Sequence, residues 1–190
     1  MNAPIDITGV TLKTPRLLLR PWRVSDLEDF HAYARVDGVG QMAGWTPHRD
    51  LAESRRILEM FIEEKKTFAL EHQGRAIGSL GIETYEESRY PGLGLEDRLG
   101  REIGYVLSKD YWGRGLMPEA VTAAVRYLFD AAGLDFLVVA HYDWNRQSAR
   151  VIEKCGFRYV TTVRRETAFG KSERSLEYIL YNPGKHNEEA

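Results

Sequence analysis

The stretch KDYWGRGLMPEA, residues 109–120, constrains the fold of this chain more than any other segment. Residues 102–107 before it have an apolar strand pattern, and apolar residues at helical spacing follow it: Val121, Ala124, Val125, Leu128 and Phe129. Gly133 can end that helix, and the continuous apolar run 136–140 is typical of a strand buried on both faces. The order predicts a strand–helix–strand crossover, and therefore a mixed α/β fold.

The rest of the chain supplies further strands and helices around this crossover. Residues 16–20, 67–71, 76–83, 157–166 and 174–181 have strand patterns. Ser25 with Glu28, and Asp50 with Glu53, have the spacing of capping boxes, so we expect a helix to begin at each pair; a short helix is expected near 146–154. We expect a single domain over residues 8–182, with loose tails at 1–7 and 183–190.

Composition and charge exclude several classes of protein. The net charge of −2 gives no overall field that favours nucleic acid or an anionic membrane. The single cysteine, Cys155, allows no internal disulfide, and neither a membrane-spanning run nor an apolar signal core is present, so we expect a cytoplasmic protein. The histidines are scattered, and we expect no metal site.

Gly113 and Gly115 flank Arg114 at the start of the predicted helix, and two interpretations of these glycines remain open. They can form a plain turn between strand and helix. They can also let a phosphate approach the unpaired N–H groups of a helix N-terminus, with Arg114 as an added cation. The segment matches neither the Walker nor the Rossmann glycine pattern.

Several stretches, taken in order, resemble the Gcn5-related N-acetyltransferase (GNAT) family and its RimJ/RimL-like branch. These are TPRLLLRPWRVSDLEDF (14–30), GRAIGSLGI (74–82), REIGYVLSKDYWGRG (101–115), YWGRGLMPEA (111–120) and NRQSARVIEKCGF (145–157). The resemblance implies a GNAT-like domain, with a central, mostly antiparallel twisted sheet of six to seven strands and helices on both faces. It also implies an acyltransferase that moves acetyl from acetyl-CoA to a primary amine by direct attack in a ternary complex.

The resemblance assigns cofactor-binding roles by position. The pyrophosphate would rest on the loop of Trp112, Gly113, Arg114, Gly115, Leu116 and Met117. Trp112 stands where the family has Gln or Arg, and Met117 stands where a small residue is common. The pantetheine arm would follow Val106 and Leu107, with Asn145 and Ser148 near the pantetheine and the sulfur. Arg150 or Lys154 can lie near a cofactor phosphate, although a solvated basic face is the alternative.

Two residues are candidates for catalysis. Glu102 resembles the family's general base, with a plain ion pair as the alternative. The tyrosine that serves many members as general acid is Ile152 here, so Ser148 is the candidate to assist the leaving thiolate, unless it only caps its helix. His141 can replace Glu102 as base or be structural, and water alone can suffice.

The sequence alone does not decide which amine accepts the acetyl group. A protein N-terminal α-amine (the ribosomal-protein type) is favoured over a small-molecule amine, and a coenzyme A-binding sensor without catalysis is the non-enzyme alternative. Trp45 either lines the acceptor pocket or packs in the core, and Cys155 either carries an acyl group or, as we favour, is buried. No nucleic-acid or membrane partner is expected, and the branch suggests a possible homodimer.

Overall fold

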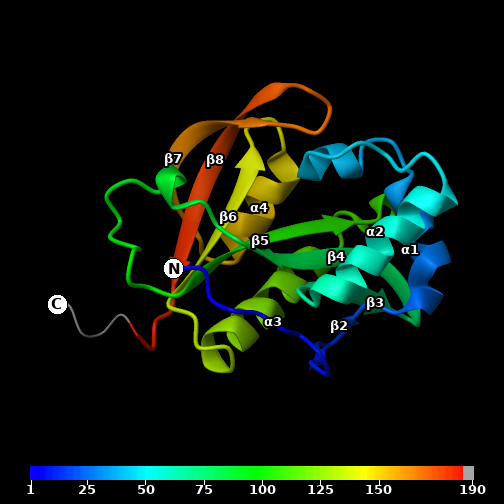
Figure 1. Cartoon of the computed structure of the whole chain (residues 1–190), viewed down its shortest axis with the longest axis horizontal. Coiled ribbons are helices and arrows are strands. Elements are labelled where there is room, and N and C mark those ends of the chain that lie inside the picture. Colours follow the sequence, from blue (N-terminus) through cyan, green and yellow to red (C-terminus); the bar gives the residue numbers. More distant parts are fainter. Residues whose placement is uncertain (186–190) are drawn as a thin grey trace.

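One sheet of eight strands runs through the computed structural model, which describes residues 1–185 (Figure 1). The strands are β1 (Leu12–Lys13), β2 (Leu18–Pro21), β3 (Thr67–His72), β4 (Arg75–Glu83), β5 (Gly100–Leu107), β6 (Phe136–Tyr142), β7 (Arg158–Glu166) and β8 (Ser172–Tyr181). The α-helices are α1 (Leu27–Ala34), α2 (Leu51–Glu64), α3 (Leu116–Asp130) and α4 (Arg146–Lys154). The short 3₁₀ helices are η1 (Val24–Asp26), η2 (Gly40–Ala43), η3 (Glu87–Arg89) and η4 (Lys109–Tyr111). The predicted fold class is confirmed, and the strand count exceeds the expected six to seven because Leu12–Lys13 adds a two-residue edge strand.

The strand order is β1-β2-β3-β4-β5-β6-β8-β7, and every neighbouring pair is antiparallel except β5 and β6. These two are parallel and joined by α3, which is the predicted crossover. Their ladder covers only residues 100–102 of β5 and 136–138 of β6. Beyond Glu102 the two strands diverge, as Figure 1 shows, so the second half of β5 faces β6 without a ladder between the described residues. The sheet is thus opened at its centre.

Helices cover both faces of the sheet. Adjacent residues of a strand point to opposite faces, so they pack against different helices. Leu107 belongs to one apolar core together with α3 residues such as Val121 and Leu128, which we call the α3-side core. Its neighbour Val106 belongs instead to a second core with Phe30 of α1 and Leu58 of α2, which we call the α1–α2 core. The apolar stripe predicted for the helix that follows Gly115 is confirmed, because these residues of α3 face the α3-side core.

Local capping signals were right for one helix and wrong for another. Asp50 caps α2 as expected, with its carboxylate accepting a hydrogen bond from the Glu53 N–H at 2.8 Å. The helix expected from Ser25 begins differently, because the carboxylate of Asp26 accepts from the Arg23 N–H at 2.8 Å. Asp26 is the N-cap of α1 but makes no side-chain capping bond to that helix, and its carboxylate is also bound at 2.8 Å by the buried guanidinium of Arg20.

The expectation of a loose N-terminal tail was wrong. Ala3 and Ile7 are buried, and both belong to the α3-side core. The Met1 amine donates to the Arg98 carbonyl at 2.7 Å, and Asn2 bridges to Gly100. At the other end Lys185 pairs with Asp135 at 2.7 Å, and the rest of the expected C-terminal tail, 186–190, lies outside the described residues.

Candidate active site

The glycines of the opening stretch sit where the backbone needs them. Gly113 and Gly115 have φ values of +74° and +73°, which L-residues rarely adopt, so the turn itself calls for glycine. Gly115 is the N-cap of α3 and, having no side chain, makes no capping bond to the first N–H groups of that helix. The first N–H groups of α3 are therefore available to a ligand. The turn interpretation and the anion-site interpretation are both compatible with this geometry.

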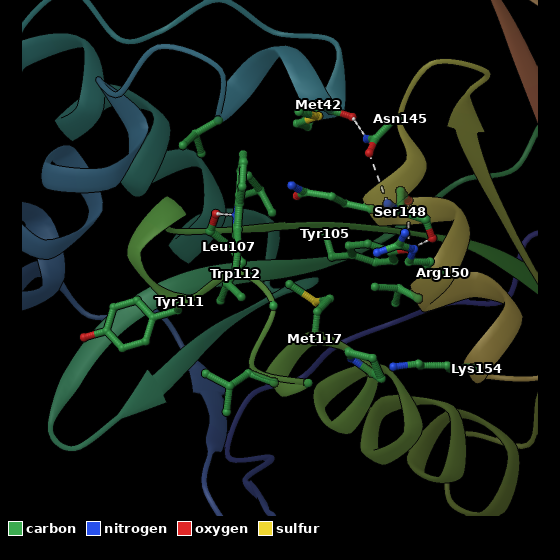
Figure 2. A pocket seen from close by; sticks show the side chains of 18 residues that line it. Met42, Tyr105, Leu107, Tyr111, Trp112, Met117, Asn145, Ser148, Arg150 and Lys154 are labelled. Atoms are coloured by element: carbon green, nitrogen blue, oxygen red, sulfur yellow. Dashed lines mark hydrogen bonds between the residues drawn. The ribbon is translucent and has the colours of Figure 1, made fainter.

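A cavity of about 320 Å³ joins this loop to the opened centre of the sheet (Figure 2). It is bordered by η2, by the second half of β5, by the loop and first turn of α3, and by α4. The predicted residues that line it are Val106, Leu107, Trp112, Gly113, Gly115, Leu116, Met117, Asn145 and Ser148. Arg150 and Lys154 line it as well. Arg114 does not; its guanidinium lies over the Tyr111 ring, 5.2 Å from the centroid.

Trp112 fixes the loop against the end of β5. Its indole N–H donates to the Leu107 carbonyl at 2.8 Å, and its ring packs against both cores. This bond turns the chain back toward the sheet immediately after the strand. The loop therefore places the first turn of α3 beside the free edge of β5.

Asn145 caps the N-terminus of α4, and Ser148 lies in its first turn, at the other wall of the cavity. The Asn145 side chain accepts from the Ser148 N–H at 3.1 Å and donates to the Met42 carbonyl at 3.0 Å (Figure 2). The Ser148 hydroxyl lies 3.0 Å from the Tyr105 hydroxyl. Asn145, and not Ser148, is therefore the cap of α4, and the Ser148 hydroxyl lies beside the cavity.

Glu102 lies where the β5–β6 ladder ends, and it does not line this cavity. Its side chain is 14% exposed and accepts from Arg165 Nη1 at 2.8 Å, with Arg89 at 3.6 Å. Arg165 also donates through Nε to the fully buried Glu177 at 2.9 Å, and Glu177 accepts from the Tyr90 hydroxyl at 2.9 Å. Burial raises the pKa of the Glu102 carboxyl, and the charge of Arg165 opposes that rise. The expected ion pair exists, with Arg165 as partner.

His141 is unsuited to replace Glu102. Glu102 is the register partner of Val138, so His141, three residues further along β6, points to the opposite face of the sheet. Its two ring nitrogens lie 2.8 Å from the Tyr142 carbonyl and 3.2 Å from the Tyr178 hydroxyl. The structure therefore supports the structural role.

Two other side chains have structural surroundings. Trp45 packs against the α1–α2 core, and its ring is tilted against that of His48 with the centroids 5.1 Å apart. Cys155 is half-buried against the α3-side core, 3.7 Å from the Pro118 carbonyl, and burial raises the pKa of its thiol. Neither lines the cavity.

Sequence reasoning missed a contact that holds the glycine loop. Arg16 donates through Nη1 to the Arg114 carbonyl at 2.8 Å and through Nε to Glu119 at 2.7 Å. The Thr14 hydroxyl donates to the same carboxylate at 2.6 Å. These residues tie the segment before β2 to the first turn of α3. Nothing in their local spacing signals the contact, because the partners lie about a hundred positions apart in the chain.

Residues 1–185 were considered for a metal site and for a membrane-spanning helix, and they form neither. No cluster of three His, Cys, Asp or Glu side chains among these residues is arranged to hold a metal ion. Within the same range no helix is both long enough and apolar enough to cross a bilayer.

Comparisons with known proteins agree on one family. The model of the acetyltransferase (GNAT) domain matches residues 16–158. The N-acetyltransferase p20 of Bacillus licheniformis is 28% identical over 150 residues, which cover 78% of this chain and 82% of p20.

Two solved structures share the fold. The ribosomal-protein-S5-alanine acetyltransferase of Vibrio fischeri superposes with a TM-score of 0.70 at 20% identity, over 92% of this chain and 97% of that one. The microcin C7 self-immunity acetyltransferase MccE, in complex with acetyl-CoA and AMP, superposes with a TM-score of 0.74 at 14% identity, over 88% and 93%. At these identities the two structures support the fold alone.

Proposed function

The chain belongs to the GNAT acetyltransferase family, and we propose that it transfers acetyl from acetyl-CoA to a protein N-terminal α-amine by direct attack. The family uses acetyl-CoA as the acetyl donor. The observation that carries the proposal is the single cavity that joins the α3 glycines to the free edge of β5 and to Ser148. That cavity has the parts that a long, phosphorylated thioester requires.

The residues around the cavity fit coenzyme A from one end to the other. The open space beside Gly113, where a Cβ would meet no atom within 4 Å, lets a phosphate reach the N–H groups of the α3 N-terminus. Arg150 and Lys154 supply cations on the α4 wall. The β5–β4 register, with Ser108 N–H bonded to Ile77, turns the backbone groups of Val106 toward β4 and those of Leu107 toward the β6 side. The Leu107 carbonyl is taken by Trp112, so its N–H, which has no ladder partner among the described strands, can bond an amide carbonyl of the pantetheine arm.

Glu102 and Ser148 are proposed for the two proton movements. The neutral amine attacks the thioester carbonyl, forming a C–N bond while the C–S bond breaks. The ammonium proton leaves toward Glu102, directly or through water, and the Ser148 hydroxyl assists the departing thiolate by donating a hydrogen bond to its sulfur. Burial raises the pKa of Glu102, which makes its carboxylate a better base than an exposed one.

Among primary amines, an α-amine acceptor needs the weakest base to remove its proton. Its pKa is about 7.7–8.0, against about 10.4 for a lysine side chain, so a fraction of it is already neutral at pH 7. One protein of this fold is named as a ribosomal-protein-S5-alanine acetyltransferase, which agrees with this choice. A small-molecule amine is the second candidate, because the fold is shared equally with MccE, which was solved with AMP.

The test has a binding arm and a turnover arm. Acetyl-CoA at a hundred times its Kd should stabilise the protein by about 2.7 kcal/mol, which raises Tm by about 5–10 °C. Turnover is then measured as thiol release with N-terminal peptides, the same peptides with a blocked α-amine and a free lysine, and a panel of small amines. Activity confined to free N-termini supports the proposal. Activity confined to small amines favours the second candidate, and a Tm shift without turnover on any acceptor supports a coenzyme A sensor instead.

A further inference from the structure

Tyr105 of β5 reaches across the opened centre of the sheet to α4. Its hydroxyl oxygen lies 3.0 Å from Ser148 Oγ and 3.5 Å from the Ser148 carbonyl oxygen. Both side chains line the cavity, and Figure 2 shows them directed toward each other. The contact spans the region where β5 and β6 no longer form a ladder. Neither the family match nor the motif that carried the resemblance assigns a role to this tyrosine.

The chemistry of the two hydroxyls gives the hydrogen bond a direction. The Ser148 carbonyl at 3.5 Å is a poor acceptor for the Tyr105 proton, whereas Ser148 Oγ lies at an ordinary O–H···O distance. A phenol is the more acidic of the two hydroxyls, so Tyr105 donates and Ser148 Oγ accepts. The single proton of Ser148 is then directed elsewhere, toward the cavity that both residues line.

We propose that Tyr105 is a positioning residue that holds the Ser148 proton toward the leaving sulfur of the thioester, an inference that rests on the proposed function. Accepting a hydrogen bond also makes Ser148 a stronger donor, since linked hydroxyls polarise one another. Tyr105 itself does not release its proton. Burial raises the pKa of its phenol, so it keeps its proton at neutral pH. It therefore acts through Ser148 and not as a second acid.

The inference is tested by a double-mutant cycle on turnover. Tyr105→Phe removes only the hydroxyl, and we expect kcat to fall about tenfold while the KM for acetyl-CoA stays within about twofold. Ser148→Ala should lower kcat at least as much. In the Ser148→Ala background Tyr105→Phe should then change kcat by less than about twofold, because its target is gone.

Tyr178→Phe is the matched control. This substitution also removes a tyrosine hydroxyl that bonds a side chain, because the Tyr178 hydroxyl lies 3.2 Å from His141 Nε2. His141 does not line the cavity. The substitution should lower Tm by as much as Tyr105→Phe and leave kcat unchanged. Thermal melts of all variants separate loss of structure from loss of function.

The outcomes distinguish the two levels of the argument. Equal losses from Tyr105→Phe with and without Ser148, or no loss in either background, would overturn the positioning role while the proposed function stands. A wild-type protein that binds acetyl-CoA but acetylates no amine would overturn the proposed function and this inference with it.

Discussion

Replacing Gly113 by alanine separates the two reasons for a glycine at that position. Its φ of +74° places the residue in the left-handed region, and its missing Cβ leaves open space in the cavity wall. Gly156 is the matched control, because it has a φ of +82°, an exposed position and equally open space, but it lies at the end of α4 outside the cavity. The two alanine variants therefore share the backbone strain and differ only in what the new methyl group faces.

The strain should cost both variants the same stability. An L-residue in the left-handed region costs about 1–2 kcal/mol, and the smaller conformational entropy of unfolded alanine returns a part of this. A net loss of about 1 kcal/mol lowers Tm by about 2–4 °C in a domain of this size. Thermal denaturation without ligand measures this contribution.

Binding should be weakened in only one of the variants. A phosphate that accepts N–H bonds needs its oxygens about 2.7–3.2 Å from the amide nitrogens, and a methyl group at Gly113 would hold it further away. Losing one charge-assisted hydrogen bond costs about 1.5–3 kcal/mol, or roughly a 10- to 150-fold increase in Kd. Calorimetric titration with coenzyme A should show this increase for Gly113→Ala and none for Gly156→Ala. If both variants bind like the wild type after the same loss of Tm, the glycine serves the turn alone, and the phosphate interpretation is wrong.

Three further predictions follow from the charged and capping residues. Glu102→Gln keeps the side-chain shape, and steady-state kinetics should show a fall in kcat of about 100-fold with an unchanged acetyl-CoA KM, whereas a negligible fall would leave water as the only base. Asn145→Ala removes the α4 cap, so urea or thermal denaturation should show a loss of about 1 kcal/mol, and an unchanged Tm would mean that the cap contributes nothing. Burial lowers the pKa of His48 from 6.5, so the unfolded chain binds its proton more readily than the folded protein. Stability should be complete above about pH 6.5 and fall as the pH drops below it, by at most about 1.4 kcal/mol per pH unit, and urea denaturation of His48→Gln across this range should show a shallower loss.

The sequence predicted the parts of the site that depend on neighbours in the chain. The glycine loop, the helix that follows it and the buried strand after that are each encoded within about fifteen residues, by spacing and by turn chemistry. The Asp50 cap is local in the same way, since donor and acceptor lie three residues apart. Where another partner is present, local reasoning was wrong: at the first helix the carboxylate of Asp26, and not Ser25, accepts hydrogen bonds, from the Arg23 N–H and from the buried Arg20.

The sequence did not predict the contacts that cross the sheet. The Arg165–Glu102 bond joins β7 to β5 across 63 positions, and the Tyr105–Ser148 bond joins β5 to α4 across 43. Each depends on strand order, because β8 lies between β6 and β7, and on register, because a shift of one residue would turn Glu102 to the other face. Burial of the N-terminal residues is equally invisible locally, since Ala3 and Ile7 acquire their partners only once the sheet exists.

The divergence of β5 and β6 explains why the proposed catalytic residues lie where they do. A continuous ladder would leave every N–H group of β5 paired and no space between the strands for a ligand. The ladder stops at Glu102, so the break that exposes the β6-facing edge of β5 at Leu107 begins beside a carboxylate held by Arg165. Tyr105 lies three residues beyond the break, on the face opposite Glu102, where it meets α4. One strand therefore presents a proposed base to one side of the opening and a hydroxyl pair to the other, which is the arrangement that an amine and a thioester entering from opposite faces would need.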